Sequence, residues 1–204
     1  VALSLSDKLD SLVGFFGINL KPTSSKDPYA IRRMAISLVR LIVENEIKIK
    51  LKDLIVYTCS VYRDQGYEFD IKKIQNELSD FIIERLKNYL KEKKIRQDII
   101  EGSTFLLGLD DILKAYKKSL CLNKNIKKEI GIETIAAYKR SSNILNAEEK
   151  MSTESLGFAD PGLFKNDYEK KLYKKINDIR KYFLSIGKDE NYEESLKILS
   201  SIKN

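Results

Sequence analysis

The chain has 204 residues, 43% of them hydrophobic and 33% charged, which is enough to bury one large core or two small ones and excludes a disordered chain. It contains no histidine, so a Ser-His-Asp or Cys-His nucleophile pair, a histidine metal site and a histidine general base are excluded within these residues. The formal net charge of +7 favours a polyanionic partner, although the excess of lysine over arginine is also typical of an AT-rich genome.

The first 66 residues predict three helices and a basic loop. Ser6 and Asp7 are expected to cap a short helix that ends before the loop GINLKPTSSKDP. Asp27 and Pro28 then form a strong helix-start signal, because a carboxylate accepts an unpaired N–H and a proline has no N–H to leave unpaired. The helix that they open reads AIRRMAISLVRLIVE, and the next is predicted from about residue 51 to Gly66.

The rest of the chain is also helical in pattern. The longest helix is predicted from about residue 70 to 94, because its apolar residues keep a spacing of three or four for over five turns. Shorter helices are predicted at 97–107, 110–122 and 125–146, the last with Gly131 as the candidate position for a bend.

The C-terminal part begins with a polar stretch, 148–159, that has no clear period and predicts a loop. Asp160 and Pro161 repeat the helix-start signal, and the helix that they open is expected to end near Gly187. A last helix is predicted at 191–202. No strand pattern of convincing length occurs, so we predict an all-α fold, a helical bundle in two helical parts.

No catalytic, metal or cofactor site is predicted. The sequence has no Gly-rich phosphate loop, and no pair of carboxylates stands out from the acidic background. Cys59 and Cys121 lie in apolar stretches and are expected to be buried thiols of a cytosolic protein. No apolar run approaches the roughly 18–20 residues that a membrane span needs.

Three basic clusters are candidates for binding phosphate. The first, Lys21, Lys26, Arg32 and Arg33, lies beside a predicted helix N-terminus, where free N–H groups and the helix dipole also suit an anion. Two more clusters lie on predicted helices: Lys139, Arg140 and Asn143, and the series Lys170, Lys171, Lys174, Lys175 and Lys181. Each has a plain alternative, namely a solvated loop or the charged outer face of an amphipathic helix.

The second cluster has the residue types that read RNA. Lys139 and Arg140 would meet phosphates, and Asn143, one helical turn further on, would contact a base edge. In the same segment, AAYKRSSNIL, the small and aliphatic residues are expected to pack against a neighbouring helix: Ala136, Ala137, Ile144 and Leu145.

These segments together resemble the β subunit of glycyl-tRNA synthetase. The run SDKLDSLVGFFGINLKPTSSKDPYAIRRMAISLVRLIVE is similar, nearly end to end, to the family pattern DKLD-T-LVG-F followed by KPTGSKDPFALRR. FIIERLKNYLKEKKIRQDIIEG resembles the segment that leads into the anticodon-binding domain, and AAYKRSSNIL resembles the A-x-KR-x-x-NIL element of DALR-type anticodon-binding domains. DPGLFKNDYEKKLY matches the helix start that follows. The first stretch is long and specific, whereas KR-x-x-NIL alone is weak; one serine of KPTSSKDP replaces the family's usual glycine.

The resemblance implies that residues 1–68 end an HD-like helical domain and that residues 69–204 belong to a DALR-type anticodon-binding domain. The chain begins without a methionine and stops at SSIKN, before the family's terminal helices, so we expect a C-terminal fragment and leave the completeness of its last domain open.

The resemblance also implies a cytoplasmic glycine–tRNA ligase of two α and two β subunits. The α subunit activates glycine, ATP with Mg²⁺ serves the whole enzyme, and the β subunit grips glycine tRNA. The first two basic clusters are then the expected tRNA-binding residues: Lys139, Arg140, Asn143, Lys21, Lys26, Arg32 and Arg33. The fragment itself is expected to hold no catalytic residue, metal or cofactor and to be inactive alone.

Two other interpretations stay open at this point. The chain is a purely structural module that contacts other parts of the synthetase, or it is the DALR domain of another synthetase, such as the arginyl enzyme. The KPTSSKDPYAIRR stretch favours the glycyl β subunit over the second of these. The HD-type phosphohydrolase activity uses histidine and aspartate and is excluded for these residues.

Overall fold

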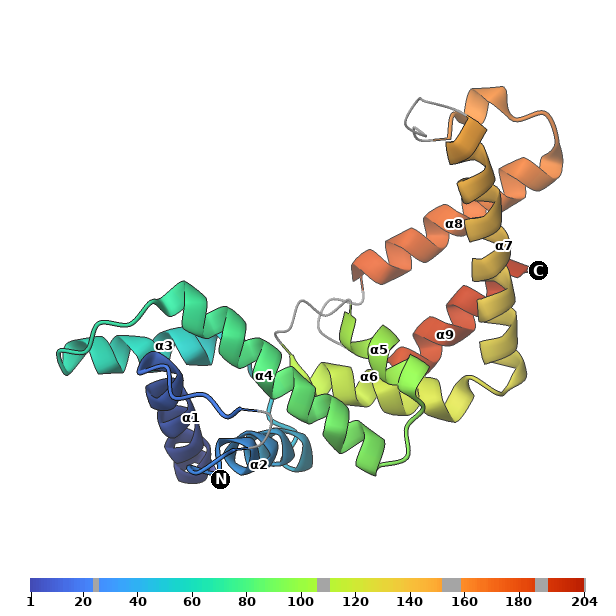
Figure 1. The fold of residues 1–204 in the computed structure, drawn as a ribbon. Coiled ribbons are helices and arrows are strands. Elements are labelled where there is room, and N and C mark those ends of the chain that lie inside the picture. The colour runs from blue at the N-terminus through green and yellow to red at the C-terminus, as the bar shows by residue number, and fades with distance from the viewer. Residues whose placement is uncertain (24–25, 106–110, 152–158, 186–190, 204) are drawn as a thin grey trace. The chain divides into compact units, whose positions relative to one another are not determined.

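The structure is a computed structural model that describes residues 1–23, 26–105, 111–151, 159–185 and 191–203 (Figure 1). All regular structure in these residues is helical, which confirms the predicted all-α class. The chain divides into two compact units, Val1–Leu120 and Cys121–Asn204. The expected boundary at 68/69 lies inside the first unit and stays a prediction about family domains. No helix among the described residues has the length and apolarity to cross a membrane.

In its described residues the first unit has five helices and the beginning of a sixth: α1 (Ala2–Gly17), α2 (Ile31–Glu44), α3 (Leu51–Asp64), α4 (Ile71–Glu92), α5 (Gln97–Phe105) and α6 (Ile112–Asn125). The long helix α4 packs against α1, α2, α3 and α5 and is the centre of this unit (Figure 1). Its inner face is the apolar stripe that the spacing predicts, and four of its residues are almost completely buried: Leu78, Ile82, Leu86 and Leu90. The core therefore forms around α4.

Helices α1 to α4 all end in the same Schellman motif. The residue after each C-cap has a positive φ: 59° at Asn19, 49° at Glu46, 89° at Gly66 and 59° at Lys94. In each case its N–H and the next N–H bond back to carbonyls of the last turn, as in Lys94 N–H to Lys91 O (2.9 Å) and Ile95 N–H to Leu90 O (3.2 Å). Only the stop at Gly66 follows from the sequence pattern, because the other three positions carry side chains.

Two helix starts in the first unit differ from the prediction. Helix α1 begins at Ala2, so Ser6 and Asp7 lie inside it and do not cap it. Helix α2 begins at Ile31, three residues after Pro28, and Ala30 before it has a left-handed backbone (φ 56°). Asp27 still caps α2, because its carboxylate accepts the N–H groups of Ile31 (2.8 Å) and Arg32 (3.0 Å).

The second unit contains the end of α6, then α7 (Glu129–Met151), a 3₁₀ turn (Pro161–Leu163), α8 (Asp167–Ser185), α9 (Tyr192–Ser200) and a last 3₁₀ turn (Ser201–Lys203). Helix α7 packs on α9, and α8 makes fewer contacts with α9. Neither α8 nor α9 has a buried residue among those described. This unit therefore leaves much apolar surface exposed.

The second Asp-Pro signal opens a 3₁₀ turn and not the expected α-helix. Asp160 accepts the N–H of Gly162 (2.8 Å) and caps only that turn. Helix α8 begins six residues later, where Asn166 accepts the N–H of Glu169 (2.9 Å) and the Glu169 carboxylate accepts the N–H of Asn166 (3.1 Å). This reciprocal pair is a capping box, and it sets the start of α8.

The predicted loop at 148–159 is wrong for its first four residues, because α7 continues to Met151; residues 152–158 lie outside the described part. The break between α6 and α7 falls at residues 126–128, before Gly131. Gly131 sits in the first turn of α7 against that break, and a Cβ there would lie 2.3 Å from the Asn125 carbonyl oxygen. The glycine permits this close approach of two backbone segments.

Candidate nucleic-acid interface

The first basic cluster is brought together around the loop before α2, but two of its cations have protein partners. Lys21 pairs with Glu77 of α4 through Nζ and Oε2 at 2.5 Å. Arg32 donates a hydrogen bond to the carbonyl oxygen of Thr23. Lys26 and Arg33 have exposed side chains. Lys21 and Arg32 therefore hold the loop against α2 and α4.

The start of α2 does not offer the free N–H groups that the sequence indicates there. The Asp27 carboxylate binds the N–H groups of Ile31 and Arg32, and its negative charge opposes an anion at the same place. The expectation that free N–H groups at this helix end attract phosphate is therefore wrong. Only the cationic side chains of this region remain to attract an anion.

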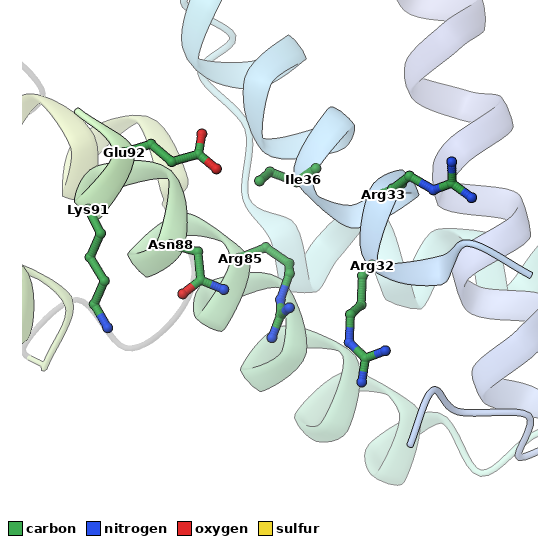
Figure 2. A pocket seen from close by; sticks show the side chains of 7 residues that line it. All are labelled: Arg32, Arg33, Ile36, Arg85, Asn88, Lys91 and Glu92. Carbon is green, nitrogen blue, oxygen red and sulfur yellow. The ribbon is translucent and has the colours of Figure 1, made fainter. Parts of the chain in front are cut away.

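Arg32 and Arg33 also line an open pocket of about 420 Å³ between α2 and α4. The other lining residues are Ile36, Arg85, Asn88, Lys91 and Glu92. Figure 2 shows Arg32, Arg85, Asn88 and Lys91 extending toward one side, whereas Glu92 turns toward Ile36 and Arg33 points away. None of the α4 residues that line the pocket was singled out from the sequence. Their value as a site depends on α2 lying opposite, which spacing does not reveal.

The second cluster lies on one exposed stretch of α7. Lys139, Arg140 and Asn143 are all exposed, and no hydrogen bond or ion pair joins them to another described residue. Next to them Tyr138 is 73% exposed. The cluster thus presents two cations, an amide and an aromatic ring to solvent within little more than one helical turn.

The aliphatic residues of the same segment do not pack as predicted. Ile144 is 59% exposed and Leu145 is 47% exposed, and Ala136 is exposed as well. Ala137 alone of the four is half-buried. The prediction is wrong in this structure because α9, the main packing partner of α7, does not cover that part of the helix.

The third cluster forms the outer side of α8. Four of its lysines are exposed and Lys175 is half-buried; Lys170 lies 3.8 Å from Asp167, an exposed pair within the helix. The apolar residues of the same helix are themselves partly exposed, with Leu172 at 46%, Ile176 at 47% and Phe183 at 42%. The helix is amphipathic, and both of its faces are open to solvent in this unit.

No catalytic arrangement is found among the described residues. No group of three or more His, Cys, Asp or Glu side chains within them could hold a metal ion. Cys59 is buried as predicted, and Cys121 is only partly buried. Burial raises the pKa of both thiols, which is the opposite of what an activated nucleophile needs.

Known proteins resemble this chain over its whole length. A sequence model of the family "Glycyl-tRNA synthetase beta subunit" matches residues 1–104. The glycine–tRNA ligase β subunit of Clostridioides difficile is 30% identical over 203 residues, and that of Rhodospirillum centenum is 33% identical over 205 residues. Both alignments cover 100% of this chain and 28% of the relative. That of Rickettsia canadensis is 33% identical over 98% of this chain. The chain therefore spans about 28% of the length of these relatives.

Proposed function

The chain belongs to the glycyl-tRNA synthetase β-subunit family, and on that basis we propose that it is a tRNA-binding part of a glycine–tRNA ligase. Its contribution is recognition of glycine tRNA, in the anticodon region, without bond chemistry of its own. Residues 1–68 belong to the end of an HD-like domain and residues 69–204 to a DALR-type anticodon-binding domain. The partners are glycine tRNA and the α subunit in a cytoplasmic assembly of two α and two β subunits, which uses ATP with Mg²⁺.

The observation that carries this proposal is the exposed group on α7. RNA loops are recognised when cations meet phosphates while unstacked bases find aromatic faces and hydrogen-bonding groups. Lys139 and Arg140 supply the cations, and Asn143 supplies a donor and an acceptor for a base edge. Tyr138 supplies a ring on which a base can stack. An ordinary solvated helix face needs none of these to occur together.

The second candidate function is that of an interaction module within the synthetase. The exposed apolar residues of α8 favour it, because a globular domain normally covers a stripe such as Leu172, Ile176 and Phe183. A protein surface of the same assembly would cover this stripe. The two functions are compatible, since α7 and α8 present different side chains.

The test is binding of a glycine tRNA transcript to the purified chain, measured by fluorescence anisotropy at several salt concentrations. The double variant Lys139→Ala, Arg140→Ala should bind about 10–100-fold more weakly near 0.1 M salt. The slope of log affinity against log salt concentration should be smaller in magnitude by about 1.4–1.8. The reason is that each phosphate no longer neutralised leaves about 0.7–0.9 counterions on the RNA.

The matched control is the double variant Lys127→Ala, Lys165→Ala, which removes the same charge from exposed positions of the same unit. It should bind like the wild type apart from a small general effect of charge. Equal affinity of the α7 variant and this control would remove Lys139 and Arg140 from the binding site. An unchanged melting temperature for both variants confirms that folding is intact.

We also expect the isolated chain to be inactive in glycine-dependent pyrophosphate exchange with ATP and Mg²⁺. The reason is that no nucleotide loop and no metal-binding group occurs among its described residues. Exchange should appear only when the α subunit is added. Exchange by the pure chain would contradict the proposed division of labour.

A further inference from the structure

The pocket between α2 and α4 has a strongly uneven charge. Four of the seven side chains that line it are cations, Arg32, Arg33, Arg85 and Lys91, and one is an anion, Glu92. Glu92 is already bound, because its Oε2 lies 3.2 Å from the guanidinium of Arg40. The pocket therefore keeps an excess of positive charge that no carboxylate of its own wall neutralises.

Arg85 is held in place before any ligand arrives. Its guanidinium carbon lies 5.0 Å from the centre of the Phe81 ring, whereas the 3.1 Å contact of its NH2 with the exposed Glu84 Oε2 adds little. Its side chain is only 16% exposed, and its Nε is buried without a hydrogen-bond partner. Preorganisation of this kind lowers the entropy cost of binding.

The carboxylates near the pocket do not cancel this charge. Glu84, the partner of Arg85, is 69% exposed, so that pair is weak. Glu101 is bridged by Lys87 at 3.0 Å, and this contact, with a smaller contribution from Lys91, holds its pKa below the usual range. Lys91 itself is exposed at the end of α4. It remains able to turn toward an anion.

The hydrogen-bond donors of the pocket are arranged in a row along α4 and do not converge on one point. Arg85, Asn88 and Lys91 occupy positions i, i+3 and i+6 of α4, which places them over about 9 Å of helix axis. Arg32, whose NH2 already donates to the Thr23 carbonyl oxygen, adds its remaining N–H groups from α2, and Figure 2 shows these four side chains extending to the same side. One phosphate cannot reach along such a row, whereas consecutive phosphates of a strand can. Ile36 also lines the pocket, on the side toward which Glu92 turns.

We propose that this pocket is a second RNA contact, in which Arg32, Arg85 and Lys91 bind consecutive phosphates of the backbone and Asn88 supplies a neutral donor. The proposal rests on the tRNA-binding function above, and it adds a site in the first unit to the α7 cluster of the second. Phosphate contacts of this kind position an RNA and do not read its sequence. The pocket is therefore indifferent to the anticodon.

The experiment measures binding of the glycine tRNA transcript to the whole chain. Lys91→Gln and Arg85→Gln should each weaken binding about three- to tenfold near 0.1 M salt and flatten the salt dependence by about 0.7–0.9. A transcript with a changed anticodon should show the same losses. Lys91→Arg should keep the affinity, because it keeps the charge. The control is Lys72→Gln, which removes an exposed lysine from the same helix outside the pocket and should have little effect.

Because Arg85 packs on Phe81, the folding of the Arg85→Gln variant is checked by circular dichroism and by its melting temperature. If that variant unfolds, the binding measured for Lys91→Gln decides, since Lys91 is exposed. In one outcome, the wild type binds tRNA, the double variant Lys139→Ala, Arg140→Ala binds more weakly, and Lys91→Gln binds as tightly as Lys72→Gln. That outcome overturns the pocket as an RNA contact and leaves the proposed function standing. No binding by the wild type overturns both. ATP binding is measured as well. If the wild type binds ATP and Lys91→Gln does not, while tRNA binding is unchanged, the pocket binds a mononucleotide and the RNA assignment is overturned.

Discussion

Replacing Ile82 by alanine should lower the free energy of unfolding by about 2–5 kcal/mol, the usual cost of removing three carbons from a fully buried aliphatic side chain. Ile82 is 0% exposed in the middle of α4, the helix that packs against α1, α2, α3 and α5. The cavity left by the change lies where these helices meet, so their packed side chains cannot easily fill it. Urea denaturation followed by circular dichroism measures the loss.

Two comparisons make the result specific. Ile82→Val removes one carbon and should cost about 0.5–1.5 kcal/mol. Asp80→Ala changes an exposed residue of the same helix and should stay within about 0.5 kcal/mol of the wild type. Hydrogen exchange should show the loss of protection in α1 to α5. A cost for Ile82→Ala no larger than that for Asp80→Ala would mean that α4 is not the centre of the core.

Alanine should have opposite effects at two helical glycines. At Gly102 in α5 a Cβ meets nothing within 4 Å, so Gly102→Ala should stabilise by about 0.5–1 kcal/mol through helix propensity. At Gly131 the Cβ would lie 2.3 Å from the Asn125 carbonyl oxygen and 2.6 Å from the Ile126 Cα. Both are backbone atoms, so Gly131→Ala should destabilise by about 1–3 kcal/mol.

The two glycine variants serve as each other's control, since the same methyl group is added to a helix in both. Urea denaturation should show their free energies of unfolding about 1.5–4 kcal/mol apart. Stabilisation by both changes would show that the turn at 126–128 can move away from α7. In that case Gly131 would not fix the connection between α6 and α7.

The helices were predictable where one periodic pattern determines them, and their ends were not. The spacing in α4 alone predicts a helix from about residue 70 to 94, and the structure has Ile71–Glu92. The same Asp-Pro signal, however, precedes α2 by a few residues and in its second occurrence opens only a 3₁₀ turn. The difference arises from the local hydrogen bonds. Asp27 accepts N–H groups of α2 and so caps that helix, whereas α8 is capped by the Asn166–Glu169 capping box and begins there.

The candidate site was predictable in its residue types and not in its geometry. Lys139, Arg140 and Asn143 share an exposed stretch of α7 as the spacing indicates. Lys21 would have counted equally from the sequence, yet it is bound to Glu77, 56 residues away. Arg85 was not among the candidates from the sequence, because its importance comes from α2 on the other side of the pocket. Contacts between segments distant in sequence decide which cations remain available.

The Schellman ends of the first four helices include a position at which a substitution could still stabilise the chain. A left-handed backbone costs an ordinary residue roughly 1–2 kcal/mol, which glycine avoids and asparagine partly avoids. Gly66 and Asn19 are suited to the position, and Glu46 offsets at most a small part of the cost, because its 2.8 Å ion pair to Lys117 is exposed. Lys94 has φ 59° and an exposed side chain, with no ion pair to any described residue. A lineage that acquires glycine there gains tolerance for destabilising substitutions elsewhere, including those by which an RNA-binding surface changes its preference.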